Sequence, residues 1–104
     1  MAFTDKAWDG SASRWPDSAS YCKSCLIDDN PAGKEKIQAL CHLPVAEPDG
    51  TINANAVHNA VARLMQTKTS PANKKAAARK LKSLYGQMGV KQEDIPESLQ
   101  RMTQ

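Results

Sequence analysis

Residues 70–89 read SPANKKAAARKLKSLYGQMG, and this stretch carries a complete set of helix signals. Ser70 followed by Pro71 is typical of a helix cap and first turn. Apolar side chains recur at helical spacing and form a core stripe of Ala77, Leu81, Leu84 and Met88, with Ala78 and Tyr85 on its shoulder. Gly89 is the expected stop. The stretch therefore predicts a helix from Pro71 to about Gln87.

A second helix is predicted just before it, in INANAVHNAVARL (residues 52–64). Asn53 is a candidate N-cap, and the helix is expected to run to about Gln66. On a wheel of about 100° per residue, four side chains fall within about 100° and form its buried stripe: Val57, Ala60, Val61 and Leu64. The tetrapeptide TKTS then breaks the pattern before Ser70.

The N-terminal half is less regular. Residues 1–16 contain turn and breaker residues, but their aromatic side chains predict that this segment packs on the domain. A helix is expected over Asp17–Asp28, capped by Asp17 or Ser18, because apolar residues again recur at helical spacing. Its buried face would consist of Tyr21, Cys22, Cys25 and Leu26.

Residues 35–46 are ambiguous: EKIQALC could form a short helix, whereas Pro44 favours an extended HLPV segment. DDNPAGK and EPDG are turn signals. Near the other end, within residues 93–104, PESLQRM predicts a short helix that brings Leu99 and Met102 back onto the core. The predicted fold is an all-α single domain over residues 1–104, a bundle of three to four helices with an irregular N-terminal half.

The composition favours a soluble intracellular protein. The chain has 104 residues, enough for one modest core, and no apolar run approaches the roughly 20 residues that span a bilayer. The first residues lack the features of a secretory signal. Three cysteines, an odd number, fit a reducing compartment better than a disulfide framework. We expect a monomer with no membrane partner.

Charge is distributed very unevenly. Between Thr51 and Gln92 there is no acidic residue, while eight lysines and arginines lie there, so this block carries +8. The flanks carry −3 and −2, which gives the net charge of +3. Such a field favours polyanionic partners. We call residues 51–92 the acid-free block.

Seven cations of the block are candidate DNA-binding residues. On the helix over 71–87, three of them project within about 60° of one another, away from the core stripe: Lys75, Arg79 and Lys82. Lys80 lies at one edge, Lys68 and Lys74 at the helix entrance, and Arg63 on the flank of the preceding helix. No carboxylate lies at i±3 or i±4 to neutralise them. An ordinary lysine-rich, solvated helix face is the alternative.

The expected mode of binding is contact with the phosphate backbone of duplex DNA. TKTS lacks the glycine often found in a helix-turn-helix motif, and the outward face of the basic helix has no Asn or Gln to read an adenine. Phosphate contacts would give sequence-tolerant binding that weakens with salt.

A zinc site is the main alternative chemistry. Cys22, Cys25, Cys41 and His42 have a spacing that resembles a ligand set, but Cys22 and Cys25 lie on the apolar face of the predicted helix, where cysteine acts as a small hydrophobe. We therefore expect no metal and no cofactor. His58 and His42 are expected to be structural.

No catalytic constellation emerges either. The pairs Asp28-Asp29 and Glu47/Asp49 occur in turns, and no phosphate loop or nucleophile motif is present. Trp8 and Trp15 could stack on bases, but they are better explained as anchors of the N-terminal segment. The prediction is a non-catalytic chain.

Several segments together resemble a short domain of unknown function from tailed-phage and prophage proteins. These are AWDGSASRW, YCKSCLID, HLPVAEPDG, INANAVHNAVARL, KKAAARKLKSLYGQMG and IPESL, and they cover residues 7–99. Domains of that family are often fused to prohead maturation proteases, and we expect them also on replication or repair enzymes such as DNA ligases. The resemblance implies a phage setting and no catalytic residues; Cys22 and His42 depart from the family pattern.

Taken with the charges, the resemblance predicts a DNA-binding accessory module, such as the N-terminal domain of a phage DNA ligase, in the host cytoplasm. A tethered module raises the residence of its enzyme on DNA by effective concentration. The alternative is a virion protein, a capsid decoration or head-assembly module whose basic face meets acidic capsid protein.

Overall fold

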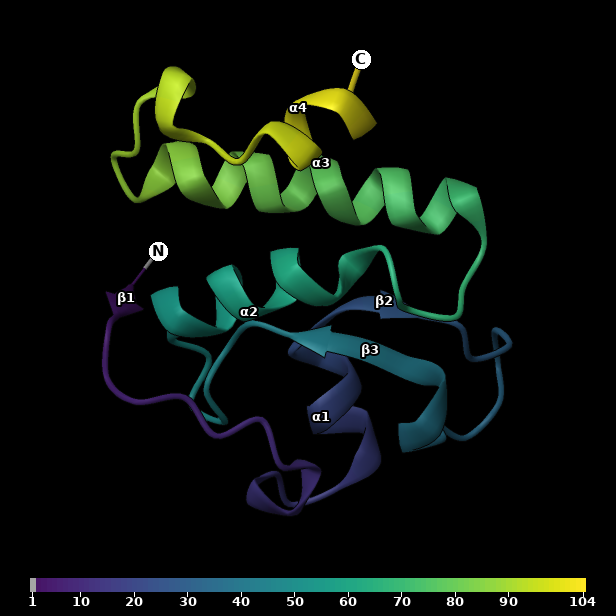
Figure 1. The fold of residues 1–104 in the computed structure, drawn as a ribbon. Coiled ribbons are helices and arrows are strands. Elements are labelled where there is room, and N and C mark those ends of the chain that lie inside the picture. Colours follow the sequence, from purple (N-terminus) through teal and green to yellow (C-terminus); the bar gives the residue numbers. More distant parts are fainter. Residues whose placement is uncertain (1) are drawn as a thin grey trace.

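The computed structural model describes residues 2–104 and contains helices together with short strands. The helices are α1 (Ser18–Lys23), α2 (Ala54–Leu64), α3 (Pro71–Gln87) and α4 (Glu97–Met102), with 3-10 turns η1 (Ala12–Arg14), η2 (Gln38–Leu40) and η3 (Gln92–Asp94). The strands are β1 (Phe3–Thr4), β2 (Cys25–Asp28), β3 (Cys41–Pro44) and β4 (Ile52–Asn53). Figure 1 shows α3 between α2 and α4, with β2, β3 and α1 on the other side of α2.

The two longest helices were predicted from local signals, and these signals are confirmed. The side chain of Asn53 accepts hydrogen bonds from the backbone N–H groups of Asn55 and Ala56, and Ser70 caps α3 through the N–H of Asn73. Gly89 has a φ of +82°, the left-handed conformation that ends α3 at low cost because glycine has no Cβ.

The core lies along α3, which packs against α2 and β2 and, separately, against α4. Its most deeply buried large side chains come one from each helix, and their exposures are 1% for Leu64, 0% for Leu81 and 0% for Leu99. The predicted stripe of α3 faces this core, with Met88 only partly buried. The short C-terminal helix is also confirmed, and Leu99 docks it onto α3 as expected.

The all-α prediction is wrong, because the protein has a mixed α/β fold with two small sheets. The helix expected over Asp17–Asp28 ends at Lys23, and the chain continues as β2, which pairs antiparallel with β3. Leu26 and Ile27 are both buried in that strand. The spacing of Cys25 and Leu26 fitted a helix, but backbone pairing with β3 makes this segment a strand.

The other ambiguous segment resolves as a short turn followed by a strand. EKIQALC forms only the single 3-10 turn η2, and HLPV continues in strand β3 as expected. Leu43, directly before Pro44, is an exception to the extended conformation, because its φ is +63°. The second sheet is a parallel pair of β1 with β4, which places the N-terminal segment beside the start of α2.

Cys22 and Cys41 are joined by a disulfide with a Cα–Cα distance of 5.2 Å. The expectation of a chain without disulfides is therefore wrong for these two cysteines, while Cys25 is free. The bond joins the end of α1 to the start of β3, and this proximity depends on the β2–β3 pairing that the sequence did not reveal.

Among the described residues 2–104, no helix is both long enough and apolar enough to cross a membrane.

Candidate nucleic-acid interface

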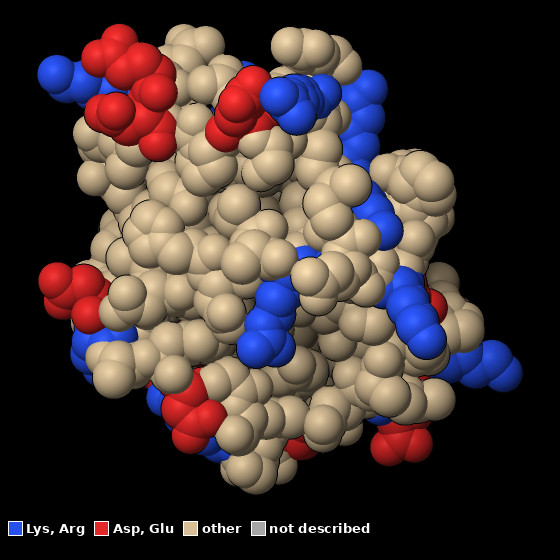
Figure 2. Space-filling model, in the orientation of Figure 1, with Lys and Arg blue, Asp and Glu red and all other residues tan. Residues whose placement is uncertain are grey.

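The cations of the acid-free block have no ion-pair partner among residues 2–104. Outside the block, four of the six lysines and arginines form ion pairs: Lys6, Arg14, Lys36 and Arg101. None of the eight inside it does so in the part of the chain that the structure describes. Figure 2 shows basic side chains along the edge where α3 begins and acidic ones over η3 at the other end of that helix.

Three of the predicted residues form what we call the α3 ridge: Lys75, Arg79 and Lys82. Lys75 and Arg79 are exposed and Lys82 is half-buried. Lys74 lies next to the ridge, but its ammonium donates to the carbonyl of Met65 at 2.9 Å. Lys75 and Arg79 lie on the exposed side of α3, as the sequence predicted, and Lys82 lies at the border of that side.

Lys80 is exposed and lies beyond the α3 ridge, toward β2. Its ammonium donates to the carbonyl of Leu26 in β2 at 3.3 Å. Lys80 therefore provides a hydrogen bond to a strand carbonyl as well as a positive charge. A helical wheel alone could not reveal this hydrogen bond.

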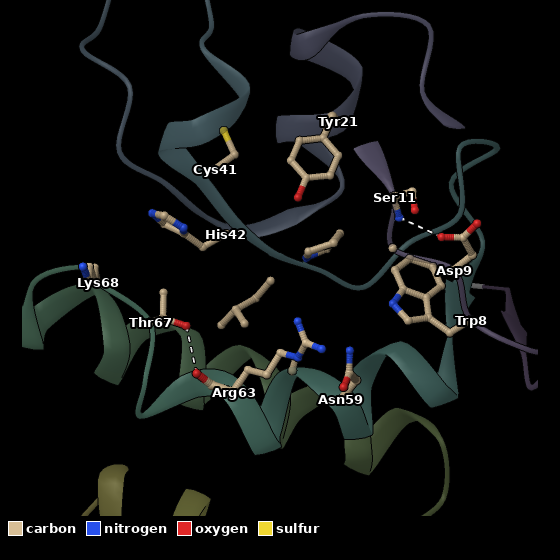
Figure 3. Close-up of a pocket in the computed structure, with 14 residues that line it drawn as sticks. Trp8, Asp9, Ser11, Tyr21, Cys41, His42, Asn59, Arg63, Thr67 and Lys68 are labelled. Carbon is tan, nitrogen blue, oxygen red and sulfur yellow. Dashed lines mark hydrogen bonds between the residues drawn. The ribbon is translucent and has the colours of Figure 1, made fainter. Parts of the chain in front are cut away.

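Arg63 and Lys68 border a groove between α2, β3 and the N-terminal segment. The groove has a volume of about 830 Å³. Trp8 and Tyr21 line it from the N-terminal half, His42 from β3 and Asn59 from α2. In Figure 3 the hydroxyl of Tyr21 and the guanidinium of Arg63 point toward each other across the groove. Sequence reasoning missed this site because its walls come from four separate segments.

The donors on the α2 side of the groove are not used within the protein. Among residues 2–104, no hydrogen bond involves the side-chain nitrogens of Arg63, Asn59 or Lys68, whereas His42 faces Asp29 at 3.4 Å. Burial, followed by the nearby Cys25, raises the pKa of Tyr21 to about 12, so its hydroxyl stays protonated at neutral pH. The groove therefore offers hydrogen-bond donors and positive charge.

Aromatic packing holds the N-terminal wall of the groove in place. Trp15 is 5% exposed, and its indole N–H donates to the hydroxyl of Ser24 at 3.0 Å. Its ring centroid lies 5.1 Å from that of Tyr21 in an edge-on arrangement. Trp15 is thus the anchor that the sequence predicted. Trp8 is only partly buried and lines the groove, with the Arg14 guanidinium 5.7 Å from its ring centroid.

Glu47 connects this wall to the start of α2. Its side chain is nearly inaccessible and accepts hydrogen bonds from Arg14 and, at 2.8 Å, from Asn53. The Asn53 amide also donates to the carbonyl of Lys6, so one residue caps α2 and fixes the N-terminal segment. Burial raises the pKa of Glu47, but the hydrogen bonds from Arg14 and Asn53 outweigh it and leave that pKa lowered.

Within residues 2–104, the candidate zinc ligands Cys22, Cys25, Cys41 and His42 are not gathered into one tetrahedral set. The sulfur atoms of Cys22 and Cys41 are bonded to each other. The Asp28 carboxylate lies close to both, and the Asn30 amide also contacts both sulfurs. The Cys25 thiol donates to the carbonyl of Tyr21 at 3.3 Å, and burial raises its pKa to about 12, which makes it a poor nucleophile or ligand at neutral pH. His42 faces Asp29 instead.

The other predicted structural residues have specific partners. Nδ1 of His58 lies 2.8 Å from the hydroxyl of Tyr85, which joins α2 to α3. Asp49 accepts from the backbone N–H of Thr51 in the EPDG turn, the local role expected for an aspartate there.

Acid should weaken the contacts between the end of β2 and the segment that follows it, through Asp28. Hydrogen bonds from Lys36, at 2.5 Å, and from Asn30 lower the pKa of Asp28 to about 2. A carboxylate whose pKa is lowered by folding stabilises the protein above its unfolded pKa of about 3.9 and loses that contribution as the pH falls toward 2. Because the Lys36–Asp28 ion pair is largely exposed, we expect the free energy of unfolding to fall by about 1 kcal/mol or less. Urea unfolding across this pH range would measure it, and Asp28→Asn should lack this part of the pH dependence.

No protein-family model, curated protein or solved structure matches this chain.

Proposed function

We propose that this chain is a non-catalytic module that binds the phosphate backbone of duplex DNA through the α3 ridge, with Lys74, Lys68 and Arg63 extending the contact. The observation that supports it is the contrast in ion pairing: the acid-free block has eight cations and no ion pair among residues 2–104. Unneutralised like charges repel one another, and phosphates would relieve that repulsion. By the resemblance to phage domains, the module would serve a phage DNA-processing enzyme such as a ligase in the host cytoplasm.

Binding should depend steeply on salt. Each neutralised phosphate contributes a slope of about −0.9 in log K against log salt. The triple variant K75Q/R79Q/K82Q removes the α3 ridge and should make the slope shallower by about 2.7, together with a loss of affinity at low salt. Fluorescence anisotropy with a labelled duplex across a salt series would measure both quantities.

The matched control changes the same net charge elsewhere. K23Q/K34Q/R101Q lies outside the acid-free block and should leave the salt slope close to that of the parent protein. Equal effects of the two triple variants would show that only net charge matters, and the α3 ridge would then not be the binding face.

The virion alternative has one observation in its favour. The Cys22–Cys41 disulfide would persist on a particle outside the cell, whereas the cytosol keeps most thiols reduced. In that case the basic face would meet acidic capsid protein. Absence of duplex binding even at low salt would favour this reading over the first.

A further inference from the structure

We propose that the groove beside Arg63 holds an unpaired nucleotide, so that the protein prefers duplex DNA with a single-stranded extension over a blunt duplex. This inference rests on the proposed function and deepens it, because it assigns a ligand to a site that the α3 ridge leaves unused.

One end of the groove is aromatic. Trp8 and Tyr21 line it, and Trp15 packs edge-on against both of them, with ring centroids 6.3 Å from Trp8 and 5.1 Å from Tyr21. This packing restrains the two groove-lining rings. Every base has a flat face, so stacking on such side chains holds single strands without regard to sequence.

The other side of the groove suits a phosphate. Arg63 and Lys68 supply positive charge, and Asn59 supplies an amide beside them. Figure 3 shows the side chains of Arg63 and Asn59 directed into the groove from α2. Asp9 lies at the Trp8 end, where hydrogen bonds from Ser11 lower its pKa and keep it ionised. Arg14 lies at the same end as Asp9, over the Trp8 ring, so the two charges offset each other there. Arg63 and Lys68 have no ion pair among residues 2–104, so the Arg63 side is where a phosphate is attracted.

The size of the groove selects against a duplex. About 830 Å³ lies within the usual range of small-ligand sites, about 300–1,000 Å³. Such a space accommodates a nucleotide, but not a base-paired helix. Leu43 lines the same groove with a φ of +63°, a strained conformation for a branched residue, and such strain is often found at binding sites.

The groove is also continuous with the proposed duplex-binding face. Lys68 borders the groove and lies in the loop that leads into α3. Lys74 follows on the first turns of α3 and donates to the carbonyl of Met65 at the end of α2, next to the loop. A strand that leaves a duplex held on the α3 ridge would thus pass these cations before it reaches Arg63.

The test compares two labelled probes by fluorescence anisotropy: a short blunt duplex, and the same duplex with a short oligothymidine extension. One stacked base should raise the affinity of the wild-type protein about 5- to 150-fold. Arg63→Gln and Trp8→Leu should each reduce that preference, whereas Lys82→Gln on the α3 ridge should weaken binding of both probes by the same factor. Tryptophan emission provides a second readout, because the partly buried Trp8 should be quenched by the extended probe alone.

Equal affinity of the wild-type protein for the two probes would overturn this inference while leaving duplex binding by the α3 ridge intact. An equal loss on both probes in Arg63→Gln would do the same, because Arg63 would then act only as one more duplex contact. No binding of either probe at low salt would overturn the proposed function and this inference together.

Discussion

Glu47→Ala is expected to lower the free energy of unfolding by about 3 kcal/mol. Removing one member of a buried ion pair typically costs about 3–5 kcal/mol, because the other member loses its compensation. The lower value applies here, since the Arg14 side chain is 27% exposed and can regain water. The Asn53 amide also loses one of its two acceptors and keeps only the carbonyl of Lys6. For a domain of this size, each kcal/mol corresponds to about 4–8 °C in the thermal midpoint.

Two further variants separate charge from hydrogen bonding at this position. Glu47→Gln keeps an oxygen that can accept from Arg14 and Asn53, so it should cost less than Glu47→Ala. The double variant Arg14→Leu/Glu47→Leu should lose less stability than the sum of its single variants, because neither charge is left unpaired. A free energy of unfolding for Glu47→Ala within about 0.5 kcal/mol of the parent, the usual range for a surface change, would contradict this role.

Removal of the Cys22–Cys41 disulfide should lower the free energy of unfolding by about 3 kcal/mol. The bond closes a loop of sequence separation 19, and constraint of the unfolded chain over such a loop accounts for this magnitude. Urea unfolding of C22S/C41S, or of the parent protein in reductant, would measure the loss.

Cys25→Ser is the control for this comparison, because Cys25 is the free thiol. This variant keeps the disulfide, so reductant should lower its free energy of unfolding as much as that of the parent. C22S/C41S itself should be insensitive to reductant. Because α3 and its ridge lie apart from the disulfide, the variant should still bind a blunt duplex under conditions where it is folded. Unchanged unfolding of the parent on reduction would show that the bond adds no stability.

The sequence predicted the elements whose signals are local. Ser70, Pro71 and Gly89 mark the two ends of α3, and its core stripe needs only the helical period, so α3 could be placed within a residue. The strand β2 could not, because Cys25 and Leu26 fit a helical face equally well and the deciding partner is β3, further along the chain.

In the candidate site, too, the features with local sequence signals were predictable and those that depend on distant partners were not. The α3 ridge follows from spacing on one helix, whereas the contact of Lys80 with Leu26 could not be predicted because the acceptor is in another element. Arg14 and Glu47 are 33 residues apart, and no local pattern connects them. Trp8 and Arg63 line the same groove although they are far apart in the sequence, so the groove could be recognised only in the folded chain.

The uneven charge along α3 affects how the protein would approach a polyanion. With cations where the helix begins and the acidic residues of η3 beyond its end, the molecule has an electric dipole along its longest helix. A phosphate-rich surface would exert a torque on that dipole before contact and rotate the cationic end toward itself. Such pre-orientation speeds encounter more than it prolongs the complex. Added salt should therefore slow association more than it hastens dissociation.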